Sequence, residues 1–224
     1  MLFKESVSIA IAALLSNKLR SILTMLGIII GVGAVIVMIS IGMGVRQNVT
    51  NSIASLGSNM LIVTPGSANK GGVRSAAGSN QSLKLDDAEA IQKRIKDIDY
   101  VAPTVNSSYQ VVYGNQNWNT SVYGVTPDYM KIRSLTVASG SFITNADDNS
   151  RNRVAVIGST VATNLFGTKN PGGSNIRIHN QPFKVIGVLE SKGQSSMGSD
   201  QDDVVLVPLK TAQERLMGIT YIRS

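Results

Sequence analysis

Cysteine is absent from this chain of 224 residues, and histidine occurs once, at position 179. Without cysteine, the chain has no disulfide framework, no cysteine-ligated zinc and no thiol nucleophile. His179 lies in a predicted turn, which leaves no Ser/His/Asp system and no histidine-based metal site. The phosphate-loop pattern GxxxxGK followed by Ser or Thr is missing, as are GxSxG and HExxH. The sequence therefore predicts no catalytic residue, no cofactor and no metal ion, although Asp/Glu pairs that meet only in three dimensions stay open.

Acidic residues number only 14, and two short clusters of aspartate stand out. Asp200, Asp202 and Asp203 lack the glycine and the terminal glutamate that a calcium loop has at its defined positions. Asp147 and Asp148 form the other cluster and show no metal-binding spacing either. We interpret these aspartates as charges that solubilise loops.

The net charge of +7 is distributed unevenly along the chain. Residues up to Arg46 hold four basic groups and one acidic group, and the remainder holds 17 basic and 13 acidic groups. A dedicated nucleic-acid-binding protein would concentrate Lys and Arg on one patch with aromatic residues between them. The sequence therefore predicts no nucleic-acid partner.

One segment contains no charge at all, the 24 residues from Ile22 to Val45. At about 1.5 Å per residue, a helix of this length can cross a hydrocarbon core of roughly 30 Å. It exceeds the apolar region of a cleavable signal peptide, about 7 to 15 residues, and no small-residue cleavage site follows it. Lys4, Lys18 and Arg20 precede the segment, which places the N-terminus in the cytoplasm by the positive-inside rule. We predict one uncleaved membrane helix at 22–45, with the soluble part of the chain that follows it outside.

Small residues interrupt this apolar run. Gly27 and Gly31 form a GxxxG pattern, and Gly33, Ala34 and Ser40 add to them. Small residues let a second helix approach closely, which matters because lipid supplies no hydrophobic drive for helix association. Glycine is also common in membrane helices generally, so the motif alone leaves a passive anchor open. We predict that Gly27 and Gly31 pack against partner helices.

Both flanks of the span have helical periodicity. Residues 1–21 are predicted to form a cytoplasmic amphipathic helix on the inner membrane surface together with a polar elbow, which occupies 17–21. Beyond the span, an apolar stripe with a period of 3.6 residues predicts a helical stalk at 46–57 that ends at Gly57. The stripe consists of Val45, Val49, Ile53 and Leu56.

Residues 58–224 have the pattern of an extracytoplasmic α+β domain with mixed sheets. Turn residues and apolar alternation predict two hairpins, at 101–113 with 118–125 and at 176–178 with 183–189. Further strands are expected at 60–63, 154–157 and 204–207, and a Gly/Ser/Asn-rich loop at 64–82. Helices are expected at 85–98, at 127–131, at 159–166 with a serine cap, and from a capping box of Thr211 and Glu214 to Gly218. Residues 219–224 look like a strand cut short.

Two stretches near the N-terminus carry a family resemblance. The run from Asn17 to Ile36, followed by the sequence GSNMLIVTPG at 57–66, strongly resembles the start of MacB-type ABC transporter permeases of the FtsX-like superfamily. Residues 153–158, 183–189 and 204–209 resemble the periplasmic core domain of the same family. The resemblance covers essentially the whole chain, and the elbow, the span and the GSN turn occur in order at matching spacing.

The resemblance implies a protein of the bacterial inner membrane. It would have an amphipathic helix, a first membrane helix and an external domain of two α/β subdomains. It also implies three further membrane helices, so the chain is expected to be a permease truncated at its C-terminus. The function implied is mechanotransmission, in which a separate ATPase subunit moves the external domain of a homodimeric permease. The expected outcome is export of macrolides, peptides or lipoproteins, or signalling, with a membrane-fusion adaptor as a further partner.

Two other classes stay open from the residues alone. A single-pass anchored sensor or scaffold would have the same span and domain but no ATPase, and an anchored hydrolase would use carboxylates that the sequence does not nominate. A neighbouring gene for a phosphate-loop ATPase favours transport. Activity against peptides or glycans, lost on Asp or Glu substitution, favours the hydrolase.

Overall fold

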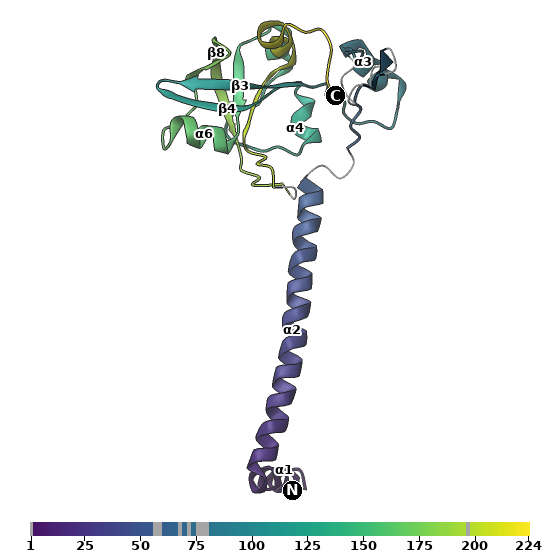
Figure 1. Cartoon of the computed structure of the whole chain (residues 1–224), viewed down its shortest axis with the longest axis vertical. Helices are drawn as coiled ribbons and strands as arrows, with labels where there is room; N and C mark the ends of the chain where they lie inside the picture. The colour runs from purple at the N-terminus through teal and green to yellow at the C-terminus, as the bar shows by residue number, and fades with distance from the viewer. Residues whose placement is uncertain (1, 56–59, 67–68, 71–72, 75–80, 196–197) are drawn as a thin grey trace. The chain divides into compact units, whose positions relative to one another are not determined.

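The computed structural model describes residues 2–55, 60–66, 69–70, 73–74, 81–195 and 198–224 (Figure 1). The chain divides into two compact units, Met1–Asn51 and Ser52–Ser224. Each unit is described by itself.

Two helices, α1 (Leu2–Ser16) and α2 (Lys18–Ser55), make up the first unit, and α2 continues past its end. The break between them is confined to Asn17, whose carbonyl already accepts a hydrogen bond from the Ser21 amide at 3.1 Å. The elbow is therefore narrower than predicted, because residues 18–21 include no Gly or Pro to delay the start of α2. With 38 residues, α2 is about 57 Å long, well beyond the apolar span.

The second unit is built on a sheet that closes on itself. Its strands are β3 (Val105–Tyr113), β4 (Gln116–Val125), β5 (Val137–Gly140), β6 (Val154–Ile157), β7 (Asn175–Ile178), β8 (Gln181–Leu189) and β9 (Val204–Pro208). The pairing runs β3-β4-β9-β6-β8-β7, and β7 pairs again with β3. These six strands form a closed barrel. The seventh strand, β5, pairs with the C-terminal part of β8, and β7 pairs with its N-terminal part.

Two of the predicted hairpins build much of this barrel. β3 and β4 join through a two-residue turn at Gly114-Asn115, in which Gly114 has a positive φ. β7 and β8 join through the two-residue turn His179-Asn180, in which both residues have a positive φ. Such left-handed residues match the twist of a two-residue hairpin. The strand predicted at 154–157 is also confirmed, as β6.

Branched and aromatic side chains fill the barrel. Along β6, Ala155 and Ile157 belong to the main hydrophobic cluster and Val156 to a second one, as expected when successive residues of a strand point to opposite faces. Helix α6 (Ser159–Phe166) adds to the main cluster. The largest fully buried side chains are Phe183, Ile157, Ile176, Ile178, Leu206, Leu209 and Ile222.

The C-terminal helix begins earlier than the sequence pattern indicates. α7 (Leu209–Thr211) follows Pro208 and leads into a π-helix, η1 (Ala212–Met217), which Gly218 ends in a left-handed conformation. The prediction of a capping box at Thr211 was wrong, because Thr211 lies inside the helix and its hydroxyl donates to the Asn152 carbonyl at 3.0 Å.

Other element boundaries also differ from those predicted. Helix α3 (Leu85–Arg94) ends before Ile98 because Ile95 adopts an extended conformation. The cap of α6 is Gly158, not a serine. Residues 219–224 form no strand. Within them, Tyr221 makes a single isolated β-bridge to Lys84. Two short helices, α4 (Asp128–Ile132) and α5 (Asn145–Asn149), complete the unit.

The N-terminal part of the second unit contains two further differences. Residues 60–63, predicted as a strand, pair with no strand of the described chain. The predicted loop at 64–82 contains a small pair of strands, β1 (Asn69–Lys70) and β2 (Val73–Arg74). Ser52–Ser224 groups as one compact unit, so the two subdomains implied by the resemblance stay a prediction.

Candidate functional site

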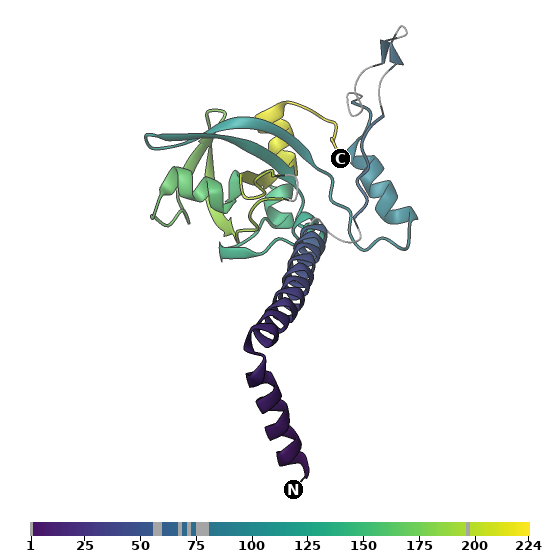
Figure 2. The same cartoon turned by 60° about the horizontal axis from the view of Figure 1, so that its bottom comes forward.

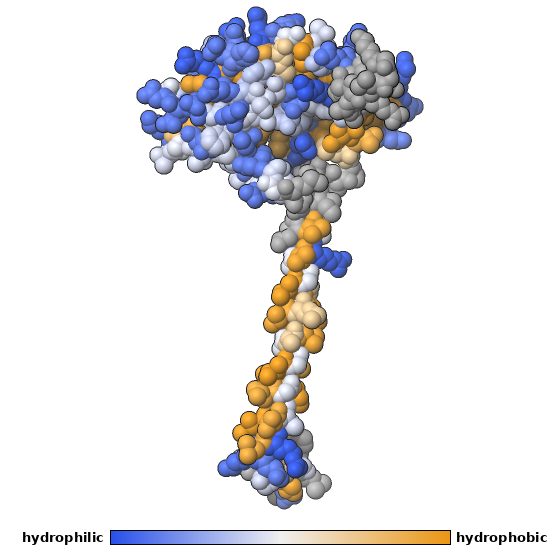
Figure 3. Space-filling view, viewed as in Figure 1, coloured by the Kyte–Doolittle hydropathy of each residue, from blue (hydrophilic) through white to orange (hydrophobic). Residues whose placement is uncertain are grey.

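The surface of α2 is apolar over most of its length. Within the described part of the chain, it is the one helix long and apolar enough to cross a membrane, over Lys18–Gln47 with a mean hydropathy of 2.8. None of that stretch is buried, and Figure 3 shows apolar surface along the helix. An apolar surface of this size requires lipid or another protein to cover it.

The glycines that were predicted to pack against partner helices lie open on this helix. A Cβ atom added at Gly27 or Gly31 would meet nothing within 4 Å. The two residues are one turn apart and therefore share a face. Their packing against another helix stays a prediction.

The residues predicted for the stalk fall in the last turns of α2 or just beyond it. Val45 and Val49 are helical and about half exposed, at 57% and 51%. Ile53 also belongs to α2, and Leu56 lies outside the described residues. The helix thus continues through the predicted stalk at least to Ser55.

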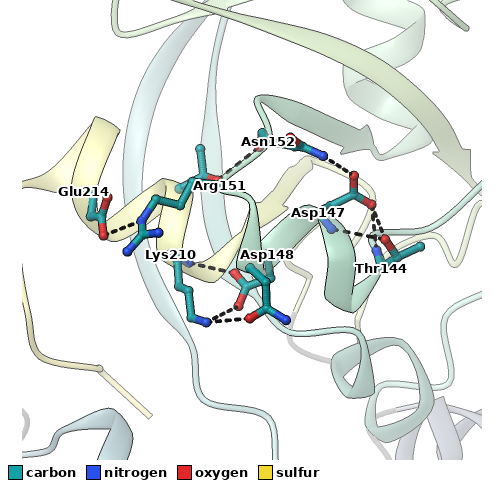
Figure 4. Close-up of polar contacts among 9 residues, drawn as sticks. Thr144, Asp147, Asp148, Arg151, Asn152, Lys210 and Glu214 are labelled. Carbon is teal, nitrogen blue, oxygen red and sulfur yellow. Dashed lines mark hydrogen bonds and ion pairs between the residues drawn. The ribbon is translucent and has the colours of Figure 1, made fainter.

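A polar cluster joins α5 to the start of α7 in the second unit (Figure 4). The buried carboxylate of Asp148 accepts a hydrogen bond from the Lys210 backbone amide at 2.8 Å. The Lys210 ammonium group lies 3.9 Å from the same carboxylate and donates to the Asn149 side chain at 2.7 Å. The cluster therefore satisfies a backbone amide at a helix start, where such groups have no partner inside the helix.

A second contact pair lies beside this cluster. Arg151 donates to Glu214 of η1 at 2.6 Å, although both side chains are about half exposed. Arg151 has a φ of +53°, which is uncommon for a residue other than glycine. At the N-terminus of α5, Asp147 accepts hydrogen bonds from Thr144 and Asn152. Burial alone would raise the pKa of Asp147, but these hydrogen bonds hold its pKa below the usual value.

The loop between β8 and β9 is organised around another buried carboxylate. Asp202 is 6% exposed and accepts hydrogen bonds from the Ser191 hydroxyl at 2.5 Å and the Lys192 and Gly193 amides at 2.8 and 3.0 Å. Desolvation alone would raise the pKa of Asp202, but these hydrogen bonds and one from Ser159 lower it below the usual value. The prediction that these aspartates only solubilise loops was wrong for Asp148 and Asp202, because each is buried and holds backbone amides.

A cleft with a volume of about 210 Å³ lies among α3, α5 and α7. Its walls include the carboxylates of Glu89, Asp128 and Asp148 and the apolar side chains of Leu85 and Leu209. Across the residues that the structure describes, no group of three His, Cys, Asp or Glu could hold a metal ion. Asp148 contacts Lys210, and Glu89 and Asp128 form ion pairs with Lys93 and Lys131 along their own helices.

Comparison with known proteins begins with the sequence. The model of the MacB-like periplasmic core domain family matches residues 21–223. The macrolide export ATP-binding/permease protein MacB of Bdellovibrio bacteriovorus is 44% identical over 211 residues, which is 94% of this chain and 32% of that protein. The MacB protein of Syntrophobacter fumaroxidans is 41% identical over 217 residues, 96% of this chain and 30% of that protein. The chain thus spans about a third of the length of these relatives.

Solved structures show the same fold. The periplasmic region of MacB from Actinobacillus actinomycetemcomitans matches with a TM-score of 0.62 at 27% identity, over 76% of this chain and 74% of that one. The extracellular domain of the ABC-type transporter YknZ from Gram-positive bacteria matches with a TM-score of 0.55 at 23% identity, over 63% of this chain and 70% of that one. From the family match over residues 21–223, the chain belongs to the MacB-like periplasmic core domain family.

Proposed function

We propose that the chain is the permease part of an ABC-type export complex that transmits motion across the bacterial inner membrane. The observation that carries this proposal is the family match over residues 21–223, which takes in most of the exposed apolar helix together with the barrel. The basic residues before the span support a cytoplasmic N-terminus and a barrel outside. The names of the relatives, which combine macrolide export with ATP binding, support transport.

The mechanism we propose uses α2 as a lever. Its 38 residues include no proline, and a continuous helix transmits displacement along its axis better than a jointed segment. A separate ATPase subunit would close on the cytoplasmic side, and a homodimer of this chain would carry the movement to the barrels outside. A membrane-fusion adaptor would complete the path, and the cargo would be macrolides, peptides or lipoproteins.

The proposal is tested by purifying the protein from its own cells in a gentle detergent. An ATPase subunit should co-purify, and ATP hydrolysis by the purified complex should be measurable. Mild solubilisation that recovers the membrane protein intact but without any ATPase would instead favour an anchored sensor or scaffold.

Substitution of Gly31 tests the helix surface. Gly31→Leu fills the groove beside Gly27, so association of α2 in a membrane-helix reporter should fall several-fold. Gly33→Leu is the matched control, because position 33 lies about 200° around the helix from position 31. Equal signals for Gly31→Leu and the unsubstituted helix would remove the packing role of this face.

A further inference from the structure

Four polar side chains gather at the second hydrophobic cluster of the barrel, the one that contains Val156. They are Tyr123 of β4, Tyr129 of α4, Arg133 at the C-terminal end of α4, and Lys192 in the loop between β8 and β9. Figures 1 and 2 show α4 beside the barrel, and the two tyrosines pack against the hydrophobic cluster. All four residues are partly buried. We refer to them as the Arg133 cluster.

Direct contacts hold the two cations of this cluster near each other. The Lys192 ammonium group donates a hydrogen bond to the backbone carbonyl of Arg133 at 2.6 Å. Nε of Arg133 donates to the Tyr129 hydroxyl at 3.4 Å, and the guanidinium carbon lies 5.8 Å from the centre of the Tyr129 ring. Because the guanidinium group is held through Nε, its two terminal NH2 groups are left to donate to another acceptor.

No carboxylate pairs with these cations in the part of the chain that the structure describes. Neither Arg133 nor Lys192 forms an ion pair there. Asp202 lies in the same loop as Lys192, but its carboxylate already accepts hydrogen bonds from the Ser191 hydroxyl and from the backbone amides of Lys192 and Gly193. Partly buried charges are normally paired, so two neighbouring cations without an anion indicate a vacant acceptor position.

The protonation of the cluster agrees with this geometry. Burial lowers the pKa of the Lys192 ammonium group, and the charge of Arg133 lowers it further, against an opposing effect of Asp202. Burial also raises the pKa of the Tyr123 phenol, and Tyr129 adds to that effect while Arg133 opposes it. The Tyr123 hydroxyl is therefore protonated at neutral pH and can donate a hydrogen bond. An anion beside Arg133 would relieve the repulsion between the two cations.

The donors of the Arg133 cluster suit a phosphate group. A phosphomonoester carries a charge of about −1.5 to −2 at neutral pH and three acceptor oxygens, whereas a carboxylate carries one charge and two oxygens. The terminal nitrogens of an arginine also match phosphate with two parallel hydrogen bonds. We infer that the Arg133 cluster binds a phosphate group, supplied by inorganic phosphate or by the phosphomonoester headgroup of a lipid. Arg133 and Lys192 provide the charge, and the two tyrosine hydroxyls orient the oxygens.

Calorimetric titration of the full chain in detergent with inorganic phosphate tests this site. Phosphate should bind saturably, and chloride at the same ionic strength should not. Arg133→Gln should weaken phosphate binding at least about tenfold, because charge-assisted hydrogen bonds are lost. Arg177→Gln, on the exposed side of β7, is the matched control and should leave the affinity unchanged. Binding that does not saturate, or equal weakening by both variants, overturns the inference.

A second variant keeps the site testable if Arg133→Gln does not fold. Tyr123→Phe removes one hydroxyl and leaves the ring in the hydrophobic cluster. Phosphate binding should weaken about two- to tenfold, as expected for the loss of one hydrogen bond. An affinity equal to that of the unsubstituted protein overturns the proposed arrangement.

Lipid nanodiscs separate the two sources of the phosphate group. The chain is titrated with inorganic phosphate in phosphatidylcholine nanodiscs that contain phosphatidic acid, a phosphomonoester, or phosphatidylglycerol, a diester, as the anionic lipid. A weaker apparent affinity with phosphatidic acid alone supports the site and assigns it to a lipid headgroup, and equal affinities support the site with free phosphate as its ligand. Acetate that binds as tightly as phosphate would indicate a carboxylate site and overturn the inference.

Discussion

Gly158→Ala is expected to destabilise the barrel by about 3 kcal/mol or more. A Cβ atom at this position would lie 2.0 Å from the Asp202 carbonyl oxygen and 2.9 Å from its carbonyl carbon. These two nearest neighbours are backbone atoms, and the Gly158 amide is fixed by a 2.8 Å hydrogen bond to the Val204 carbonyl. Neither side is free to move away without breaking the pairing of β6 with β9.

The loss of stability expected for Gly158→Ala comes from a steric clash and not from an unfavourable backbone conformation. Its φ of −74° and ψ of 164° are accessible to any residue. Urea unfolding followed by circular dichroism measures the change, and Gly66→Ala is the matched control because a Cβ atom there meets nothing within 4 Å. If both variants unfold at the same urea concentration, the close approach at Gly158 is not a constraint in solution.

Asp202→Ala is expected to destabilise the domain by roughly 3 kcal/mol at neutral pH. The substitution removes the charged acceptor of the part-buried hydrogen bonds from the Lys192 and Gly193 amides, and a hydrogen bond to a charged group contributes about 1.5 to 3 kcal/mol. Asp97→Ala, at an exposed turn position, is the control and should change the free energy of unfolding by less than about 0.5 kcal/mol.

The effect of Asp202 should also depend on pH. Because hydrogen bonds outweigh desolvation and lower its pKa in the folded state, the carboxylate stabilises the fold fully above the ordinary aspartate pKa of about 4. That contribution is lost as the pH falls through the lowered pKa. The stability difference between the protein and Asp202→Asn, measured from pH 7 to pH 3, should therefore shrink below about pH 4. A difference that stays constant over this range would contradict the role of the charge.

Local patterns made much of the fold predictable. The β3–β4 and β7–β8 hairpins follow from alternation and turn residues that are adjacent in sequence. The long apolar helix α2 follows from composition alone. In contrast, the closure of the barrel depends on β7 pairing with β3, and more than 50 residues separate Val111 from its partner Ile178. No local pattern carries that information.

The polar sites were less predictable than the fold. Asp202 and Asp148 differ from surface aspartates only in the amides that the folded chain brings to them, and their spacing in the sequence gives no signal. Thr211 and Glu214 have the spacing of a capping box, but the start of the helix is set by Pro208, which has no amide proton and a φ suited to precede a helix. The prediction of a strand at 60–63 was wrong because a strand forms only with a partner, and local composition does not show whether the folded chain supplies one.

The claim that α2 crosses the membrane, with the barrel outside, is tested most directly by cysteine labelling. Residues 1–224 contain no cysteine, so a single substitution introduces a unique labelling site within them. In spheroplasts of cells expressing the protein, a membrane-impermeant maleimide should label Gln110→Cys, on the barrel, and should label Lys4→Cys, on α1, only after lysis. Labelling of both positions, of neither position, or of Lys4→Cys alone before lysis would contradict this topology.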